Sequence, residues 1–170
     1  MTEGEPASED SASTRSRSVK IWVDADAAPA DVKTIVARAA MRLEIEAMLV
    51  ANHRLHAPAN NSWVRPVRVE GGPDAADDHI AAHAEPGDLA ITADIPLASR
   101  LVEKGVRTID PRGTEYTREN IGERLSVRDF MDRLRSTGVE TGGPKAYGSK
   151  DKQAFAAAFD RVLARLARNL

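Results

Sequence analysis

Residues 19–29 read VKIWVDADAAP, and the prediction of the fold starts from them. A short apolar, β-branched run stops at an acidic residue, which predicts a buried strand ending at Asp24. The segment DVKTIVARAAMRL, residues 31–43, then carries apolar residues at helical spacing and predicts a helix that follows Pro29. A strand that leads directly into a helix is typical of the start of an α/β fold.

The same alternation of strand and helix continues along the chain. It predicts an α/β fold with a parallel five-stranded sheet that helices cover on both faces. Pro66 indicates that the third strand lies at an edge of this sheet, because proline has no backbone N–H to donate to a neighbouring strand. The further strands are expected at residues 45–51, 63–70, 88–94 and 106–110, and the further helices at residues 74–84 and 96–105.

The two ends of the chain differ in composition from this central part. Residues 1–18 are rich in Ser, Glu and Thr, so we expect a disordered tail before a single domain that spans residues 19–170. Strand signals stop after Pro111, and we expect a helical extension from about that residue. It contains short helices around 118–124 and 126–135, a glycine-rich loop at 141–150 that serves as a flap or a connector, and a last helix at 151–168.

Composition and charge exclude several functions. The chain of 170 residues has no cysteine, which rules out disulfides, thiolate zinc sites and cysteine nucleophiles. The formal net charge is −2, and the tail alone holds this excess of acids, so the domain is neutral and unsuited to holding duplex nucleic acid by charge alone. With no apolar run long enough for a membrane span and no signal peptide, we expect a cytoplasmic protein.

Acidic residues follow several of the predicted strands. Because the carboxyl ends of parallel strands meet at one edge, the acids there should gather. Clustered carboxylates repel one another, and Mg²⁺ or Mn²⁺ is the simplest neutralising partner; such an ion promotes phosphodiester hydrolysis. The residues concerned are Asp24 and Asp26 after the first strand, Asp74, Asp77 and Asp78 on the helix after the third, and Asp94 and Asp110 after the fourth and fifth.

Other interpretations of these residues stay open. Asp24, Asp26 and Asp74 each also fit a turn or a helix N-cap, and the pair Asp77–Asp78 also fits a solvated helix face. His79 and His83 have the i, i+4 spacing of a zinc site, with a structural histidine pair as the alternative. The sequence alone does not choose between these uses.

Several strings together resemble the YaiI/YqxD family of uncharacterised bacterial proteins, from Val19 to the C-terminus. They are IWVDADAAP, DAADDHI, GDLAITADIPLA, DPRG, RDFMDRLRSTGVETGGP and DKQAF. One departure is Ala28, where the family usually has cysteine, so that cysteine is not required for any activity this chain shares. The family is similar in turn to PIN-like domains.

The likeness to PIN-like domains implies a three-layer α/β/α sandwich with strand order 3-2-1-4-5 and an acidic, divalent-metal nuclease centre. Its catalytic acids match Asp24, Asp77 and Asp94, the last in the T-x-D string at the end of the fourth strand. Asp26 is similar to a second acid that is specific to the YaiI/YqxD family, which implies a further metal ligand or a residue that holds a water, and Asp74 and Asp78 are secondary candidates for metal ligands. The segment 95–99 lacks the additional acid that some PIN nucleases carry there.

These observations lead to an expected function and its alternatives. We expect an endoribonuclease that uses Mg²⁺ or Mn²⁺, with Arg112 beside a substrate phosphate. The expected partners are single-stranded or structured RNA and a second copy of the chain, but no membrane. The alternatives are a non-catalytic module of the same fold that binds a metal, a nucleotide or a protein, and a small-molecule phosphohydrolase.

Overall fold

The structure is a computed structural model that describes residues 18–143 and 145–168. The prediction of a disordered tail falls almost entirely on residues 1–17, which lie outside the described residues. None of the helices in the described ranges is both long and apolar enough to cross a membrane.

The chain forms a six-stranded, mostly parallel sheet with the strand order β3-β2-β1-β4-β5-β6. The prediction of an α/β fold is therefore confirmed, and Pro66 does lie in an edge strand. The elements are β1 (Ile21–Asp24), α1 (Ala30–Leu43), β2 (Ala47–Ala51), β3 (Val64–Arg68), α2 (Ala75–His83), β4 (Leu89–Ile91), α3 (Ile95–Lys104), β5 (Arg107–Ile109), β6 (Glu115–Tyr116), α4 (Ile121–Ser136) and α5 (Ser149–Arg168).

The prediction of five parallel strands in the order 3-2-1-4-5 was wrong at one edge, where β6 adds a sixth, antiparallel strand to β5. A tight turn returns the chain here: the Asp110 carboxylate accepts hydrogen bonds from the backbone N–H groups of Arg112 and Thr114, both at 2.9 Å. Gly113 within the turn has φ +90°. Strand β6 has two residues, which is too few to show the alternation of apolar and polar side chains that predicts a strand. The sequence therefore predicts no strand after β5.

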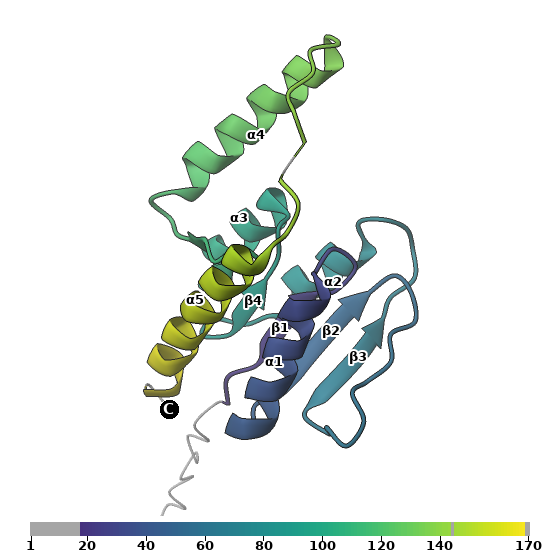
Figure 1. Cartoon of the computed structure of the whole chain (residues 1–170), viewed down its shortest axis with the longest axis vertical. Coiled ribbons are helices and arrows are strands. Elements are labelled where there is room, and N and C mark those ends of the chain that lie inside the picture. Colours follow the sequence, from purple (N-terminus) through teal and green to yellow (C-terminus); the bar gives the residue numbers. More distant parts are fainter. Residues whose placement is uncertain (1–17, 144, 169–170) are drawn as a thin grey trace, which may run out of the picture.

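Helices cover both faces of the sheet (Figure 1). On one face, α1 and α5 bury apolar side chains such as Val36 and Phe159 against Ile21 and Val23 of β1. On the other face, α2 and α3 pack Ile80 and Leu101 against side chains that include Trp22. The alternation of side chains along β1 thus divides the core into two layers, as expected for a strand buried on both sides.

Helix α4 departs most clearly from the sequence expectation. Two short helices were predicted around 118–124 and 126–135, but the structure has one continuous helix of 16 residues. Ser126 lies where the second of the two predicted helices was expected to begin. Its hydroxyl donates to the carbonyl of Gly122 at 3.1 Å, so the side chain is bonded within the helix, and the helix continues through this residue. The helix packs beside α3, has no buried residue and projects from the rest of the fold (Figure 1).

Candidate functional site

Asp24 is the last residue of β1 and lies at the centre of the sheet, where β1 pairs with both β2 and β4. Its side chain is buried, and Oδ2 accepts a hydrogen bond from the Thr92 hydroxyl at 3.0 Å. Burial raises the pKa of this carboxyl, the Thr92 bond lowers it, and repulsion from Asp94 and Asp26 raises it further. The point between β1 and β4 is where ligands bind in open parallel sheets.

Asp94 begins α3 as its N-cap, and its Oδ1 accepts a hydrogen bond from the backbone N–H of Leu97 at 2.9 Å. The backbone N–H of Asp94 in turn donates to the Thr92 hydroxyl at 3.0 Å. One hydroxyl therefore links two acids, because it donates to Asp24 and accepts from the backbone of Asp94. Thr92 is part of the T-x-D string, but this linking role could not be predicted from the sequence.

Asp77, on the first turn of α2, is half-buried and faces the same acids. Its pKa is raised to about 7, first by burial and then by repulsion from Asp94, Asp24, Asp74 and Asp78. Within the described ranges, no hydrogen bond or ion pair engages the Asp77 carboxylate. The structure thus brings Asp24, Asp77 and Asp94 into one electrostatically coupled set, which we name the acidic group.

A pocket of about 350 Å³ opens beside the acidic group, and arginines as well as acids line it. Arg100 of α3 forms an ion pair of 2.9 Å with the exposed Asp78. Arg128 of α4 lies within 3.3 Å of Asp132 on its own helix. Arg100 could not be predicted as a site residue, since its partner is 22 residues away, and Arg128 looked like part of an ordinary basic helix face. The acids that line the pocket are Asp74, Asp77, Asp78 and Asp94, while Asp24 is buried and does not line it.

Asp26 lies apart from this pocket, although its charge contributes to the raised pKa of Asp24. Its Oδ2 accepts a hydrogen bond from the backbone N–H of Asn52 at 2.8 Å, and its Oδ1 lies 2.6 Å from Nδ1 of His53. Both carboxylate oxygens are therefore engaged by the start of the loop after β2. This arrangement joins the end of β1 to the end of β2.

Arg112, predicted to contact a phosphate, does not line the acidic pocket. Its guanidinium pairs with Asp151 of α5 at 2.9 Å, donates to the carbonyl of Lys145 and lies 5.8 Å from the ring centre of Tyr147. The side chain thus connects the turn between β5 and β6 with the start of α5. Contact with a phosphate stays a prediction.

The histidine pair on α2 is a stacked one. The rings of His79 and His83 lie 4.0 Å apart, both near Trp22, and Nδ1 of His83 is 2.8 Å from the carbonyl oxygen of His79. Burial lowers the pKa of His79, followed by the effect of His83. These contacts fit the structural interpretation of the pair. Across residues 18–143 and 145–168, no three acidic or histidine side chains meet closely enough to hold a metal as they stand.

Fold and site together define an α/β protein with carboxylates at the central strand ends. The chain belongs to the YaiI/YqxD family, since the family model described as "Uncharacterized BCR, YaiI/YqxD family" matches residues 22–165.

Relatives support the same assignment over nearly their whole length. The chain is 54% identical over 150 residues to a UPF0178 protein of Myxococcus xanthus, covering 88% of this chain and 97% of the relative. It is 51% identical over 146 residues to a UPF0178 protein of Pseudoalteromonas atlantica, covering 86% of this chain and 99% of the relative. No solved structure matches.

Proposed function

We propose that this protein hydrolyses phosphodiester bonds in RNA at the acidic pocket, with Mg²⁺ or Mn²⁺ as its cofactor. The observation that carries the proposal is the acidic group: Asp24 of β1, Asp77 of α2 and Asp94 at the start of α3 lie at one edge of the sheet, where burial, together with repulsion from Asp94 and Asp24, raises the pKa of Asp77 to about 7. Uncompensated carboxylates at a concave edge are costly to the fold, so a function that uses them is the simplest reason for their presence.

The residues fit a hard divalent ion by their donor chemistry. Such ions prefer carboxylate and water oxygens, and Mg²⁺ is commonly held by one or two carboxylates with water completing its shell. Asp77 has a carboxylate without a partner among the described residues, and Asp94 uses Oδ1 for its N-cap, which leaves Oδ2 for a ligand. When bound there, the ion supplies charge stabilisation for the phosphate and a more acidic water.

Residues in and behind the pocket prepare it for a phosphate. Behind the pocket, Thr92 positions the Asp24 carboxylate and the first turn of α3, since its hydroxyl bonds to both. Arg100 and Arg128 line the pocket together with the acids, and their guanidinium groups can donate to phosphate oxygens. A pocket with both carboxylates and guanidinium groups suits a cation and an anionic substrate that bind side by side. The carboxylates would hold the cation, and the guanidinium groups would hold the substrate.

The fold adds support to the proposal. The first five strands have the order β3-β2-β1-β4-β5, which agrees with the order that the likeness to PIN-like domains implies. We include a relation to PIN-like nucleases in the proposal, with Asp24, Asp77 and Asp94 in the catalytic positions. A shared fold does not by itself establish a shared reaction, so activity has to be measured.

A non-catalytic module that binds a metal, a nucleotide or a protein at the same pocket is the second candidate. Two observations favour it: Asp78 is already paired with Arg100, and the segment 95–99 has no further acid. A small-molecule phosphohydrolase would use the same residues but would act on a phosphomonoester instead of RNA.

Cleavage of labelled single-stranded RNA in Mn²⁺ tests the proposal. We expect wild type and Asp160→Asn, a matched change at an exposed acid of α5, to cleave it, and Asp94→Asn to lose most of the activity. Asparagine also caps helices well, so Asp94→Asn should keep α3 intact. Equal cleavage by all three proteins would contradict the proposed site, and binding of RNA without cleavage would favour the non-catalytic module.

A further inference from the structure

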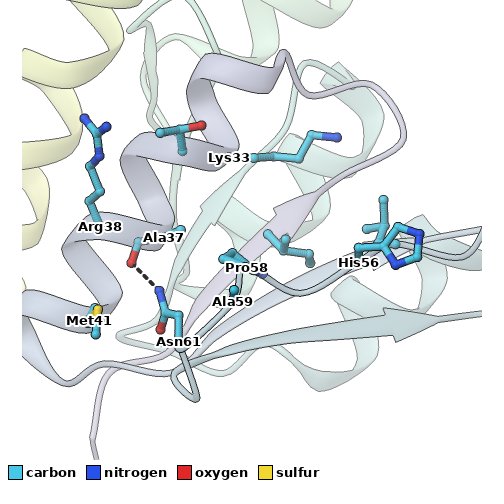
Figure 2. Close-up of a pocket in the computed structure, with 11 residues that line it drawn as sticks. Lys33, Ala37, Arg38, Met41, His56, Pro58, Ala59 and Asn61 are labelled. Carbon is cyan, nitrogen blue, oxygen red and sulfur yellow. Dashed lines mark hydrogen bonds between the residues drawn. The ribbon is translucent and has the colours of Figure 1, made fainter.

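A second pocket, of about 390 Å³, lies between α1 and the loop that joins β2 to β3 (Figure 2). It shares no lining residue with the acidic pocket. Helix α1 covers the face of the sheet opposite to α2 and α3, so the two pockets belong to different layers of the fold. Its volume falls within the range of about 300–1,000 Å³ that is usual for small-molecule sites. We name it the α1 pocket.

The inner surface of the α1 pocket is mainly apolar. Leu49 of β2 is buried at its floor, Met41 comes from α1, and Leu55 and Pro58 come from the loop. Asn61 anchors this loop, because its side-chain N–H donates to the carbonyl of Ala37 at 2.9 Å, as Figure 2 shows, and its Oδ1 accepts from the backbone N–H of Trp63 at 3.2 Å. The pocket is therefore already formed, which lowers the cost of binding.

The charged residues that line this pocket are all basic. Lys33 and Arg38 come from α1 and His56 comes from the loop, and no acid lines the pocket although the chain carries more acids than bases. Neither Lys33 nor Arg38 is in an ion pair with another residue of the described ranges. Figure 2 shows the two side chains leaving α1 in different directions, so they flank the apolar floor, and either cation complements a small anion that also has an apolar part.

Two further polar groups that line the pocket, on Thr34 and Asn61, favour a heterocyclic base over an alkyl chain as the apolar part of the ligand. The Thr34 hydroxyl donates to the carbonyl of Ala30 at 3.1 Å, which leaves its lone pairs free, and the Asn61 amide keeps one N–H after its bond to Ala37. An alkyl chain would cover both groups and offer them no partner, which costs binding free energy. The edge of a heterocyclic base offers both donors and acceptors, and its flat face suits the thioether of Met41.

We propose that the α1 pocket binds a nucleoside monophosphate, with the base on the apolar floor and the phosphate among the basic side chains that flank this floor, Lys33, Arg38 and His56. The site goes beyond the proposed hydrolysis of RNA and does not depend on it, because no residue of the acidic group takes part.

Isothermal titration of the full chain with adenosine 5′-monophosphate tests this site, in EDTA so that no metal bridges the phosphate to the acidic pocket. We expect saturable binding with one nucleotide per chain, and weaker binding of adenosine or inorganic phosphate alone. Lys33→Met/Arg38→Met, which removes both α1 charges that flank the pocket, should weaken binding at least about tenfold, the effect of losing one charge-assisted hydrogen bond. Arg42→Met removes a positive charge from α1 outside the pocket and should leave the affinity unchanged.

Four results would overturn the proposal: no binding of the nucleotide, an equal loss in Arg42→Met, tighter binding of dodecyl phosphate than of the nucleotide, or loss of binding in Asp24→Asn/Asp94→Asn. The third result would assign the pocket to an alkyl anion, and the fourth would move the nucleotide to the acidic pocket. Failure here leaves RNA cleavage untouched, and an inactive nuclease leaves the titration interpretable, so the two proposals fail separately.

Discussion

At the scale of single residues, Thr92 has the most specific role in the site. Its hydroxyl donates to the Asp24 carboxylate and accepts from the backbone N–H of Asp94, both at 3.0 Å. Thr92→Val keeps the shape of the side chain but leaves Oδ2 of the buried Asp24 without this hydrogen-bond donor. We expect the free energy of unfolding to fall by about 1–3 kcal/mol, measured by urea denaturation.

Thr92→Ser is the control for this change, because serine keeps the hydroxyl and removes only a methyl group. We expect the serine variant to retain most of the stability that the valine variant loses. A valine variant as stable as wild type would show that the hydroxyl does not support Asp24.

The raised pKa of Asp77 makes stability depend on pH. The carboxyl has a pKa of about 7 in the folded chain against the ordinary 3.8, so the folded state keeps a proton that the unfolded state has released. The contribution of this group to the free energy of unfolding is therefore fully present below about pH 4 and is lost as the pH rises through 7. Because solvent screens this half-buried group, we expect a loss of about 1 kcal/mol between pH 5 and 8.

Asp77→Asn should remove this part of the pH dependence, since asparagine does not titrate. Urea denaturation at pH 5 and pH 8 measures the difference, and Asp160→Asn on exposed α5 serves as the control that keeps it. The same decline with pH in wild type and Asp77→Asn would contradict a raised pKa at this residue.

The sequence predicted where acids would lie better than it predicted their partners. Asp24 and Asp94 follow from the rule that parallel strands end at one edge, and the structure couples them as that rule expects. Arg100 could not be predicted, because its partner Asp78 lies on another helix and only tertiary packing brings them together. Likewise, the bonds of Arg112 to α5 depend on how that helix docks, which no local pattern encodes.

At the scale of elements, the turn between β5 and β6 depends on Gly113. Its φ of +90° favours glycine, and a Cβ there would lie 2.5 Å from the backbone oxygen of Ala154 in α5. Gly113→Ala therefore strains the turn and pushes against a helix that cannot easily move. We expect a loss of about 3 kcal/mol or more in the free energy of unfolding, measured by denaturant titration.

Gly87→Ala separates these two effects. Gly87 has nearly the same φ, +91°, but a Cβ there would meet nothing within 4 Å. We expect it to cost only the conformational strain, about 1 kcal/mol. Equal losses in the two variants would mean that the approach of α5 to the turn does not matter.

Elements with a strong pattern were predicted, and those with a weak pattern were not. The strands β1 to β5 and the helices α1 to α3 occur in the predicted order, with a loop and no helix between β2 and β3. Strand β6 has two residues and depends on pairing with β5, and α4 has no buried face to give a helical apolar pattern. Strand β6 was therefore missed, and α4 was predicted as two short helices where the structure has one.

At the scale of the whole molecule, charge is distributed unevenly. The net charge is −2, yet one pocket gathers four acids and the α1 pocket on the opposite layer has only bases among its charged residues. An anionic substrate would meet repulsion at the acidic pocket unless a cation is present. The parallel sheet, with helices on both faces, could be predicted from sequence, but the separation of the two pockets depends on the packed layers.

A cation that binds the acidic pocket should also stabilise the fold. We expect millimolar Mn²⁺ to raise the melting temperature of wild type, because binding to the folded state alone adds about 1 kcal/mol at several times Kd. Asp24→Asn/Asp94→Asn should gain little from the metal. If the two melting temperatures rise equally with Mn²⁺, the metal binds elsewhere.

The rate of RNA cleavage as a function of Mn²⁺ concentration tests the proposed function most directly. Labelled single-stranded RNA is incubated with wild type and with Asp77→Asn/Asp94→Asn across a Mn²⁺ titration that starts in EDTA. We predict no cleavage in EDTA, a saturable rise in rate for wild type and a loss of at least about a hundredfold in the variant. Cleavage by wild type that is independent of Mn²⁺, or no cleavage at any Mn²⁺ concentration, would contradict metal-dependent hydrolysis at this pocket.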